Sequence, residues 1–189
     1  MLWIIDAGDD ESVTYWATLS RDIGANKGNT KGRFLVLNFR TAAALRCLDR
    51  GKVFRCIGNF LTAPYRLVCG WGMGFELPPE VHVGPGLQVF HGQGIVVHPS
   101  AHIGSDVTLR HGCTLGTKTA HCDDLNAPTL GDYVEMGAGS AVIGPVRVGD
   151  HAVIGAGAVV TTDVPEYAIV VGVPARVIGD VRDLERACR

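Results

Sequence analysis

A repeat of six residues constrains this chain more than any other feature of its sequence. An aliphatic residue leads each hexad, a glycine often follows it, and a small or β-branched residue usually occupies the fifth position. Uninterrupted hexads span 130–165 and are led by Leu130, Met136, Val142, Val148, Ile154 and Val160. Earlier hexads are led by Val83, Val89, Ile103, Leu109 and Leu115. Repeats this short are typical of a parallel β-helix, in which each coil packs on the next.

The dimensions of such a coil follow from strand geometry. Three hexads form one triangular coil of about 18 residues, and coils stack at the ~4.7–4.9 Å spacing of paired strands. The leading aliphatic residues point inward, and a following glycine lets the chain turn a corner. An antiparallel β-sandwich would need turn signals every 8–12 residues, which a spacing of six fits poorly. We therefore predict a mainly β protein, with a mostly helical region over 1–75, a parallel β-helix over 76–180 and a short helix or tail over 181–189.

The repeat is broken at two places. The step from Ile95 to Ile103 is eight residues, which predicts two inserted residues within 95–102. The step from Leu115 to Leu130 is fifteen residues, which predicts an excursion loop over 117–129. Loops that leave a rigid scaffold often carry binding chemistry.

The region before the repeat has a helical pattern. An amphipathic helix is predicted over 35–50, with its apolar face made of Leu35, Leu37, Phe39, Ala42, Leu45 and Leu48. A second helical stretch is predicted over 52–61 and a short turn from Thr62, whereas 6–33 is expected to be loop with one short helix. Seven basic residues and one acidic residue lie between 33 and 66. This basic segment suits either a peripheral contact with an anionic membrane or an anionic substrate, or it is simply a solvated helix face.

Composition excludes several functional classes. The net charge of −2 does not suit a general nucleic-acid binder. The six cysteines show no zinc-type spacing, so we expect no metal site. No signal peptide opens the chain, and no uncharged apolar run approaches the ~20 residues that span a bilayer. We therefore expect free thiols and a cytoplasmic protein, with the inner membrane face as a second location.

Two histidines fall at one corner of the predicted coil. His91 and His111 are each the third residue of their hexad, one coil apart, so we expect them to stack on one edge. The equivalent residue in the next coil is Ala138, flanked by glycines. This edge therefore has two imidazoles followed by room for a ligand.

The chain resembles a known family. The hexads, the stretch HGQGIVV over 91–97, the loop after the third coil and GVPARVIG over 172–179 look like the hexapeptide-repeat acyltransferases. More narrowly, the chain is similar to serine acetyltransferases and their relatives in colanic acid and other exopolysaccharide biosynthesis. The resemblance implies a left-handed β-helix, acetyl-CoA as co-substrate, a small-molecule acceptor, and a homotrimer whose site is shared between chains.

The resemblance also implies roles for particular residues. His91 stands where the family keeps the general base that takes a proton from the acceptor hydroxyl. Glu76 stands where serine acetyltransferases carry an Asp that orients this histidine. Positions that match the acetyl-CoA groove are Gly116, Thr117, Ala138, Ala156, Gly172, Pro174 and Arg176. Among these, Arg176 is suited to pair with a phosphate near the adenosine end.

Two departures from serine acetyltransferases concern the acceptor. Phe90 replaces the Asp that precedes the catalytic histidine, and Asn126 with Ala127 replaces an Arg-His pair before a proline. Those groups hold the charged ends of serine, so their loss favours a neutral hydroxyl on a sugar, with Phe90, Asn126 and His111 expected at the acceptor. The main hypothesis is thus a carbohydrate O-acetyltransferase of polysaccharide biosynthesis.

Other hypotheses remain beside it. The first alternative is serine O-acetyltransferase, which serves cysteine biosynthesis. A non-catalytic β-helical assembly module is less favoured. A zinc hydratase of the γ-carbonic-anhydrase type is the least favoured, because its paired histidines four residues apart are missing.

Overall fold

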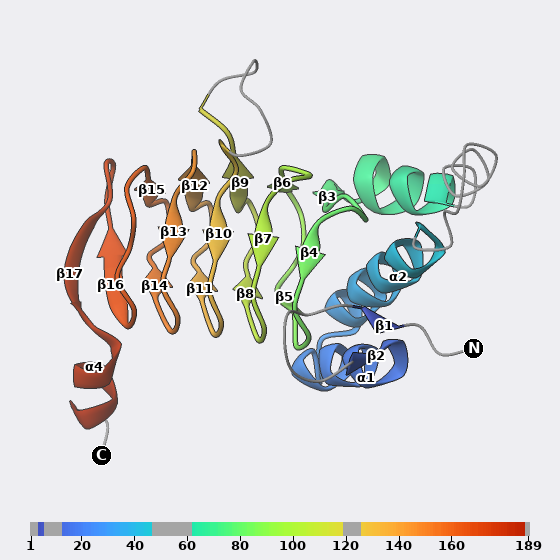
Figure 1. Ribbon diagram of the computed structural model, residues 1–189, viewed down its shortest axis with the longest axis horizontal. Coiled ribbons are helices and arrows are strands. Elements are labelled where there is room, and N and C mark those ends of the chain that lie inside the picture. The colour runs from blue at the N-terminus through green and yellow to red at the C-terminus, as the bar shows by residue number, and fades with distance from the viewer. Residues whose placement is uncertain (1–3, 6–12, 47–61, 119–125, 188–189) are drawn as a thin grey trace.

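The N-terminal helices gather at one end of an elongated coil of strands, and a short C-terminal helix lies at the other end (Figure 1). The computed structural model describes residues 4–5, 13–46, 62–118 and 126–187. The chain begins with an antiparallel pair, β1 (Ile4–Ile5) and β2 (Val13–Thr14), which leads into α1 (Tyr15–Ala25) and α2 (Thr30–Arg46). After a short helical turn at 62–65, the π-helical segment η1 (Arg66–Gly72) leads into the first strand of the coil.

The coil is built from three parallel sheets that the chain visits in turn. The first sheet contains β4 (His82–Val83), β7 (His102–Ile103), β10 (Thr129–Leu130) and β13 (Arg147–Val148). The second contains β5 (Gln88–Val89), β8 (Thr108–Leu109), β11 (Glu135–Met136), β14 (Val153–Ile154) and β16 (Ala168–Val171). The third contains β3 (Phe75–Glu76), β6 (Ile95–Val97), β9 (Thr114–Gly116), β12 (Ala141–Ile143) and β15 (Val159–Val160). The parallel coil predicted from the repeat is therefore confirmed.

The residues that lead the hexads form the core. Each of the eleven predicted leaders is at most 8% exposed, and they align in rows from coil to coil. One such row in the second sheet consists of Val89, Leu109, Met136, Ile154 and Val170. Because every leader buries an aliphatic side chain, the repeat produces one continuous apolar column along the coil.

The register corrects the predicted position of the two inserted residues. Val97, rather than Ile95, pairs with Leu115, whereas Ile95 pairs with Phe75. The path from Val89 to Val97 is therefore two residues longer than the equivalent path on the next coil. The prediction placed the extra residues within 95–102, and it was wrong because Ile95 and Val97 are both buried, so counting could not choose between them. The insertion instead widens the corner at 90–94.

The helical region differs from its prediction in several details. α2 begins at Thr30, five residues before the predicted start, whereas α1 is the one short helix expected within 6–33. Leu37 is 42% exposed, because the neighbouring Val36 is buried in its place. Residues 47–50 and the helix predicted over 52–61 lie outside the described residues.

The two helices close the open end of the first coil through buried polar side chains. Asp22 accepts a hydrogen bond from Arg40 Nε at 2.7 Å and from the N–H groups of Gly86 and Leu87 at 2.7 and 3.0 Å. Asn26 donates to the carbonyl of Leu87 at 2.8 Å and accepts from the N–H of Val89 at 3.0 Å. An uncovered strand edge would leave these backbone groups unpaired, so the helices act as an end cap.

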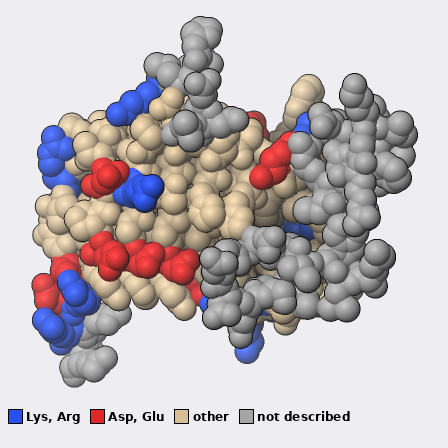
Figure 2. Space-filling view, viewed as in Figure 1, with Lys and Arg blue, Asp and Glu red and all other residues tan. Residues whose placement is uncertain are grey.

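Arg40 belongs to the basic segment over 33–66, but it does not lie on an exposed face. Its side chain is 6% exposed and bonded to Asp22, so it is not available to a membrane or an anionic substrate. On the face seen in Figure 2, acidic side chains form a row across the coil of strands. None of the helices in the described ranges is long and apolar enough to cross a bilayer.

The far end of the coil is closed differently. β17 (Arg176–Asp180) turns back and pairs antiparallel with β16, and α4 (Val181–Ala187) follows where a short helix was expected. The N–H of Val181 donates to the carbonyl of Tyr167 at 2.8 Å, which ties the start of α4 to the last coil.

Candidate functional site: the His91 corner

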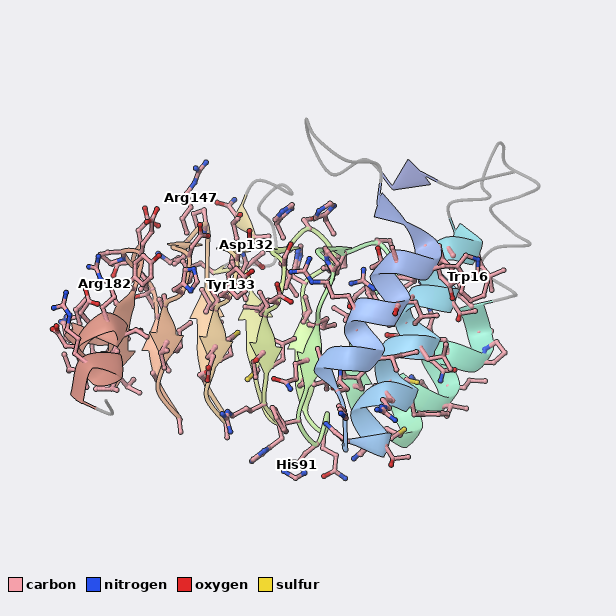
Figure 3. All side chains as sticks on the ribbon, turned by 90° about the horizontal axis from the view of Figure 1, so that it is seen from below. Trp16, His91, Asp132, Tyr133, Arg147 and Arg182 are labelled. Carbon is pink, nitrogen blue, oxygen red and sulfur yellow. The ribbon has the colours of Figure 1, made fainter. Side chains whose placement is uncertain are left out.

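His91 lies at the widened corner between the second and third sheets, which we call the His91 corner (residues 90–94 and their equivalents on later coils). Its φ of 65° places it in the left-handed region, and its side chain is exposed. Figure 3 shows it on the opposite side of the coil from Arg147. Gly92 follows with φ 67° and is buried, and a Cβ there would collide with Leu35 of α2. Only glycine lets α2 approach this closely, so the helix supports the corner from beneath.

The two predicted histidines are neighbours. The ring centroids of His91 and His111 are 5.6 Å apart and the planes meet at 74°, which is an edge-to-face contact. Their equivalence is nevertheless not the one that counting suggested. The N–H of Gly112 donates to the carbonyl of Gln93 at 2.8 Å, so Gln93 is the residue in register with His111. His91 reaches the same edge because the two inserted residues push it outward.

Beyond His111 the corner carries only small side chains. The N–H of Gly139 donates to the carbonyl of His111 at 2.9 Å, and the N–H of Gly157 donates to the carbonyl of Ala138 at 2.8 Å. This ladder, with the pairing of β14 and β16, aligns His111 with Ala138, Ala156 and Gly172. A Cβ added at Gly139 or Gly157 would meet no atom within 4 Å. The structure thus brings four of the predicted residues together along an unobstructed edge.

The other predicted cofactor residues lie elsewhere. Gly116 ends β9 at the opposite edge of the third sheet, where it pairs with Ile143, and Thr117 follows it. The outward face between this edge and the His91 corner carries the row Val96, Thr114, Ala141 and Val159. Pro174 follows a cis peptide bond, and Arg176 is exposed, with its guanidinium donating to the carbonyl of Ala175 at 2.8 Å.

The residues predicted at the acceptor are not all brought together. Phe90 lies under the guanidinium of Arg110, whose carbon is 5.4 Å from the ring centroid, and Arg110 also lies 3.7 Å from Glu135. Asn126 is half-buried at the end of the excursion loop, before β10 of the first sheet. Residues 119–125 of that loop lie outside the described residues.

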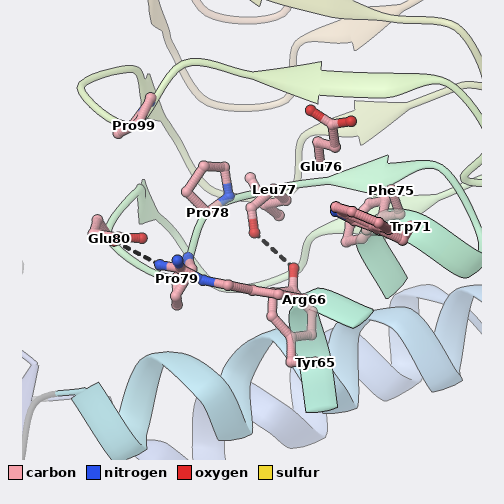
Figure 4. A pocket seen from close by; sticks show the side chains of 11 residues that line it. Tyr65, Arg66, Trp71, Phe75, Glu76, Leu77, Pro78, Pro79, Glu80 and Pro99 are labelled. Atoms are coloured by element: carbon pink, nitrogen blue, oxygen red, sulfur yellow. Dashed lines mark hydrogen bonds and ion pairs between the residues drawn. The ribbon is translucent and has the colours of Figure 1, made fainter. Parts of the chain in front are cut away.

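Glu76 lies on β3, beside Val96 of β6, and is exposed. Within the described residues no hydrogen bond or ion pair joins it to His91. The two are on neighbouring coils, since the N–H of Gly94 in the His91 corner donates to the carbonyl of Gly74 at 2.7 Å. Glu76 also lines a pocket with Trp71 (Figure 4), which the sequence analysis did not anticipate. The run GWGMGFE, with a tryptophan between glycines shortly before Glu76, is the sequence signal that could have indicated this pocket.

A second corner, between the first and second sheets, is filled by stacked side chains and was also missed. We call it the Tyr133 corner; its non-glycine residues with positive φ are Asp106, Tyr133, His151 and Tyr167. Ring centroids are 4.6 Å apart for Tyr133 and His151, and 4.7 Å apart for His151 and Tyr167, with planes within 6°. Arg182 covers the last ring at 4.6 Å, and Arg21 pairs with Asp106 at the other end.

In the part of the chain that the structure describes, no group of three or more His, Cys, Asp or Glu side chains could hold a metal ion. A pair of histidines does stack on the first sheet, with the ring centroids of His82 and His102 4.2 Å apart. Burial lowers the pKa of both, and the proximity of His102 and of Arg40 lowers that of His82 further.

Comparison with known proteins agrees with this architecture. Residues 127–162 match the family described as bacterial transferase hexapeptide (six repeats). The chain is 32% identical to the putative colanic acid biosynthesis acetyltransferase WcaB of Escherichia coli over 160 residues, covering 82% of this chain and 96% of that protein. It is 42% identical over 106 residues to the serine acetyltransferase of Mycobacterium tuberculosis, a match that covers 56% of this chain and only 46% of that enzyme.

The fold is shared with solved serine acetyltransferases. One of them, in complex with CoA, superposes with a TM-score of 0.72 at 27% identity, covering 87% of this chain and 69% of the other. The similarity to WcaB extends over nearly all of that protein, and the hexads, the parallel coil and the structural neighbour agree with it. The chain therefore belongs to the hexapeptide-repeat acetyltransferase family.

Proposed function

We propose that this chain is an O-acetyltransferase that moves the acetyl group of acetyl-CoA to a hydroxyl of a sugar, with His91 as the general base. The observation that carries the proposal is the His91 corner, where two exposed imidazoles adjoin an edge of small residues in a chain of this family. A general base needs access to the acceptor, and the thioester needs room beside it; this corner offers both.

The imidazole of His91 and the thioester together account for the proton and the bonds of the reaction. The imidazole of His91 takes the proton of the acceptor hydroxyl as that oxygen attacks the carbonyl carbon of the thioester. The carbon–sulfur bond then breaks, and the departing CoA sulfur receives the proton from His91. Acetyl-CoA is a co-substrate in this scheme, and no metal takes part. Glu76, on the neighbouring coil, is proposed to orient the imidazole and stabilise its charged form.

The cofactor groove is proposed to follow the edge of the coil. Ala138, Ala156 and Gly172 leave the backbone accessible to the pantetheine arm, while Gly116 and Thr117 border the same sheet on its other edge. Pro174 and Arg176 would lie near the adenosine end, where the exposed guanidinium suits a phosphate. The proposal includes a left-handed coil and a homotrimer of closed symmetry, whose neighbouring chain completes the groove.

A sugar is proposed as the acceptor because of Phe90 and Asn126. Phe90 stacks with Arg110 and offers no carboxylate to the ammonium of an amino acid. Similarity to WcaB over nearly its whole length favours the same conclusion. Serine remains the second candidate, since the chain is 42% identical over 106 residues to a serine acetyltransferase.

One experiment tests the base and the acceptor together. CoA release is followed by a thiol reagent with wild type, His91→Ala and His91→Gln, using acetyl-CoA and a panel of serine, free hexoses and nucleotide sugars. We expect sugars to be acetylated and kcat to fall about 10²–10⁴-fold in both variants, with unchanged thermal unfolding. Retention of most activity in His91→Ala overturns the role of His91, and release with serine alone overturns the sugar.

A further inference from the structure

A pocket of about 390 Å³ lies between η1 and the segment that follows β3 (Figure 4). Pockets of roughly 300–1,000 Å³ are typical of small-molecule sites. Its walls come from both regions of the chain: Tyr65, Arg66 and Trp71 from the helical segment, and Glu76 with three prolines from the coil. A ligand there would therefore contact the helical region and the coil at once.

Trp71 gives this pocket an unusual surface. Its side chain is 90% exposed, although the neighbouring Phe75 is 1% exposed in the core. A large flat ring exposed at the wall of a pocket offers its face for stacking on a ligand. The ring combines an apolar face with an N–H donor, so it suits a partner that is apolar on one face and polar at its rim.

The polar groups of the pocket fall into two kinds. The hydroxyl of Tyr65 donates to the carbonyl of Leu77 at 2.6 Å, and Arg66 lies 3.3 Å from Glu80, so these groups already have partners. Glu76 takes part in no ion pair recorded within the described residues, and its carboxylate can accept two or more hydrogen bonds. The carboxylate that is available to accept hydrogen bonds, that of Glu76, thus lies five residues after the exposed ring of Trp71.

The pocket and the His91 corner border the same sheet. Glu76 lies on β3, which pairs with β6, and Gly74 and Gly94 are hydrogen bonded where these strands begin, next to the His91 corner. The prolines of the pocket follow the ends of the same strands. A molecule held by Trp71 and Glu76 would therefore have to cross the outward face of the third sheet to reach the proposed base.

We propose that this pocket binds one sugar ring of the acceptor, with the C–H face of the ring stacked on Trp71 and a ring hydroxyl donating to one oxygen of Glu76, whose other oxygen is left for the proposed contact with His91. A pyranose has the required shape, an apolar face surrounded by donors and acceptors. The proposal rests on the proposed function for the identity of the acceptor, but binding itself requires no acetyl transfer.

Binding is tested first, without acetyl-CoA, by saturation-transfer NMR with the methyl glycosides of glucose, galactose and mannose. The variants are Trp71→Ala, Trp71→Phe and, as a matched control, Trp16→Ala, which removes a tryptophan that is 74% exposed on α1. We expect saturation of ring C–H protons with wild type, Trp16→Ala and Trp71→Phe, and at least a fivefold loss with Trp71→Ala. Equal signals in the two alanine variants, or no signal from any glycoside, overturn the proposal.

Kinetics then separates this pocket from the proposed function. With the sugar acceptor, Trp71→Ala should raise KM about fivefold to tenfold and leave kcat unchanged, because a lost stacking contact affects binding rather than proton transfer. An unchanged KM in an active enzyme overturns the pocket and leaves the proposed function standing. Glycoside binding in a wild-type protein that transfers no acetyl group overturns the proposed function and leaves the pocket standing.

Discussion

The two described corners of the coil use the same scaffold in opposite ways. At the Tyr133 corner, side chains stack from one coil to the next, with Arg182 closing one end. At the His91 corner, two histidines are followed by alanines and glycines. A stacked pair of rings is worth about 0.5–1.5 kcal/mol beyond its buried area, so the His91 corner forgoes stability that the other corner has. The difference is consistent with the proposal that the edge of small residues is the one that accommodates a ligand.

Ala138→Tyr would make the His91 corner resemble the Tyr133 corner, and it carries the largest expected effect. The preceding coil holds His111 at the equivalent position, so the backbone accommodates a ring there. We expect kcat/KM for acetyl-CoA to fall about 10- to 100-fold, equivalent to about 1.4–2.8 kcal/mol, because the tyrosine ring would occupy the space proposed for the pantetheine arm. His151→Tyr is the ring-for-ring control at the other corner. Normal use of acetyl-CoA by Ala138→Tyr would remove this edge from the proposed groove.

His151→Asn tests the opposite assignment, that the Tyr133 corner is structural. Asparagine tolerates the φ of 58° found at this position, so the variant removes the ring without a large backbone penalty. Loss of two ring contacts should lower the free energy of unfolding by about 1–3 kcal/mol, measured by urea denaturation. Acetyl transfer at saturating substrate should be unchanged, and a large drop in kcat would give this corner a catalytic role.

The smallest expected effect concerns the His82–His102 stack, which extends the comparison to a sheet face. Burial lowers the pKa of both imidazoles below the ordinary value in the folded protein. The unfolded chain therefore binds protons more readily, so this contribution to stability is present above about pH 6.5 and is lost as pH falls through the folded pKa values. Urea midpoints between pH 7.5 and 5 should fall less steeply in His102→Gln than in wild type. Equal slopes would show that the stack does not titrate with unfolding.

Much of the coil could be predicted because the six-residue spacing of aliphatic residues shows directly which positions are buried. Each hexad leader is inside, and His91 and His111 are neighbours as predicted, although Gln93 rather than His91 is in register with His111. Counting failed at the inserted residues, because two aliphatic residues two apart, Ile95 and Val97, both satisfy an inward position. Backbone hydrogen bonds alone distinguish them.

The helical region was harder to predict because its buried face is set by the coil it covers. Arg40 has the pattern of an exposed basic residue, yet Asp22 and two carbonyl oxygens of the first coil surround its guanidinium. Asn26 and Asn29 lie in the turn between α1 and α2, within the segment expected to be loop, but their hydrogen bonds to the backbone of β5 and its flanks could not be foreseen. The roles of these residues depend on partners some 60 positions away, which no local pattern contains. Trp71 is a partial exception: Glu76 is only five residues away, but the pocket is completed by Pro99 from the next coil.

The end cap has a consequence for any shortened form of this protein. The buried Asp22–Arg40 pair and its asparagine neighbours supply the partners that a further strand would otherwise supply to β5. A fragment that starts at Phe75 would keep its apolar interior but present bare amide and carbonyl groups to solvent. An exposed strand edge of this kind can pair with the same edge of another molecule, so the truncated protein is expected to self-associate.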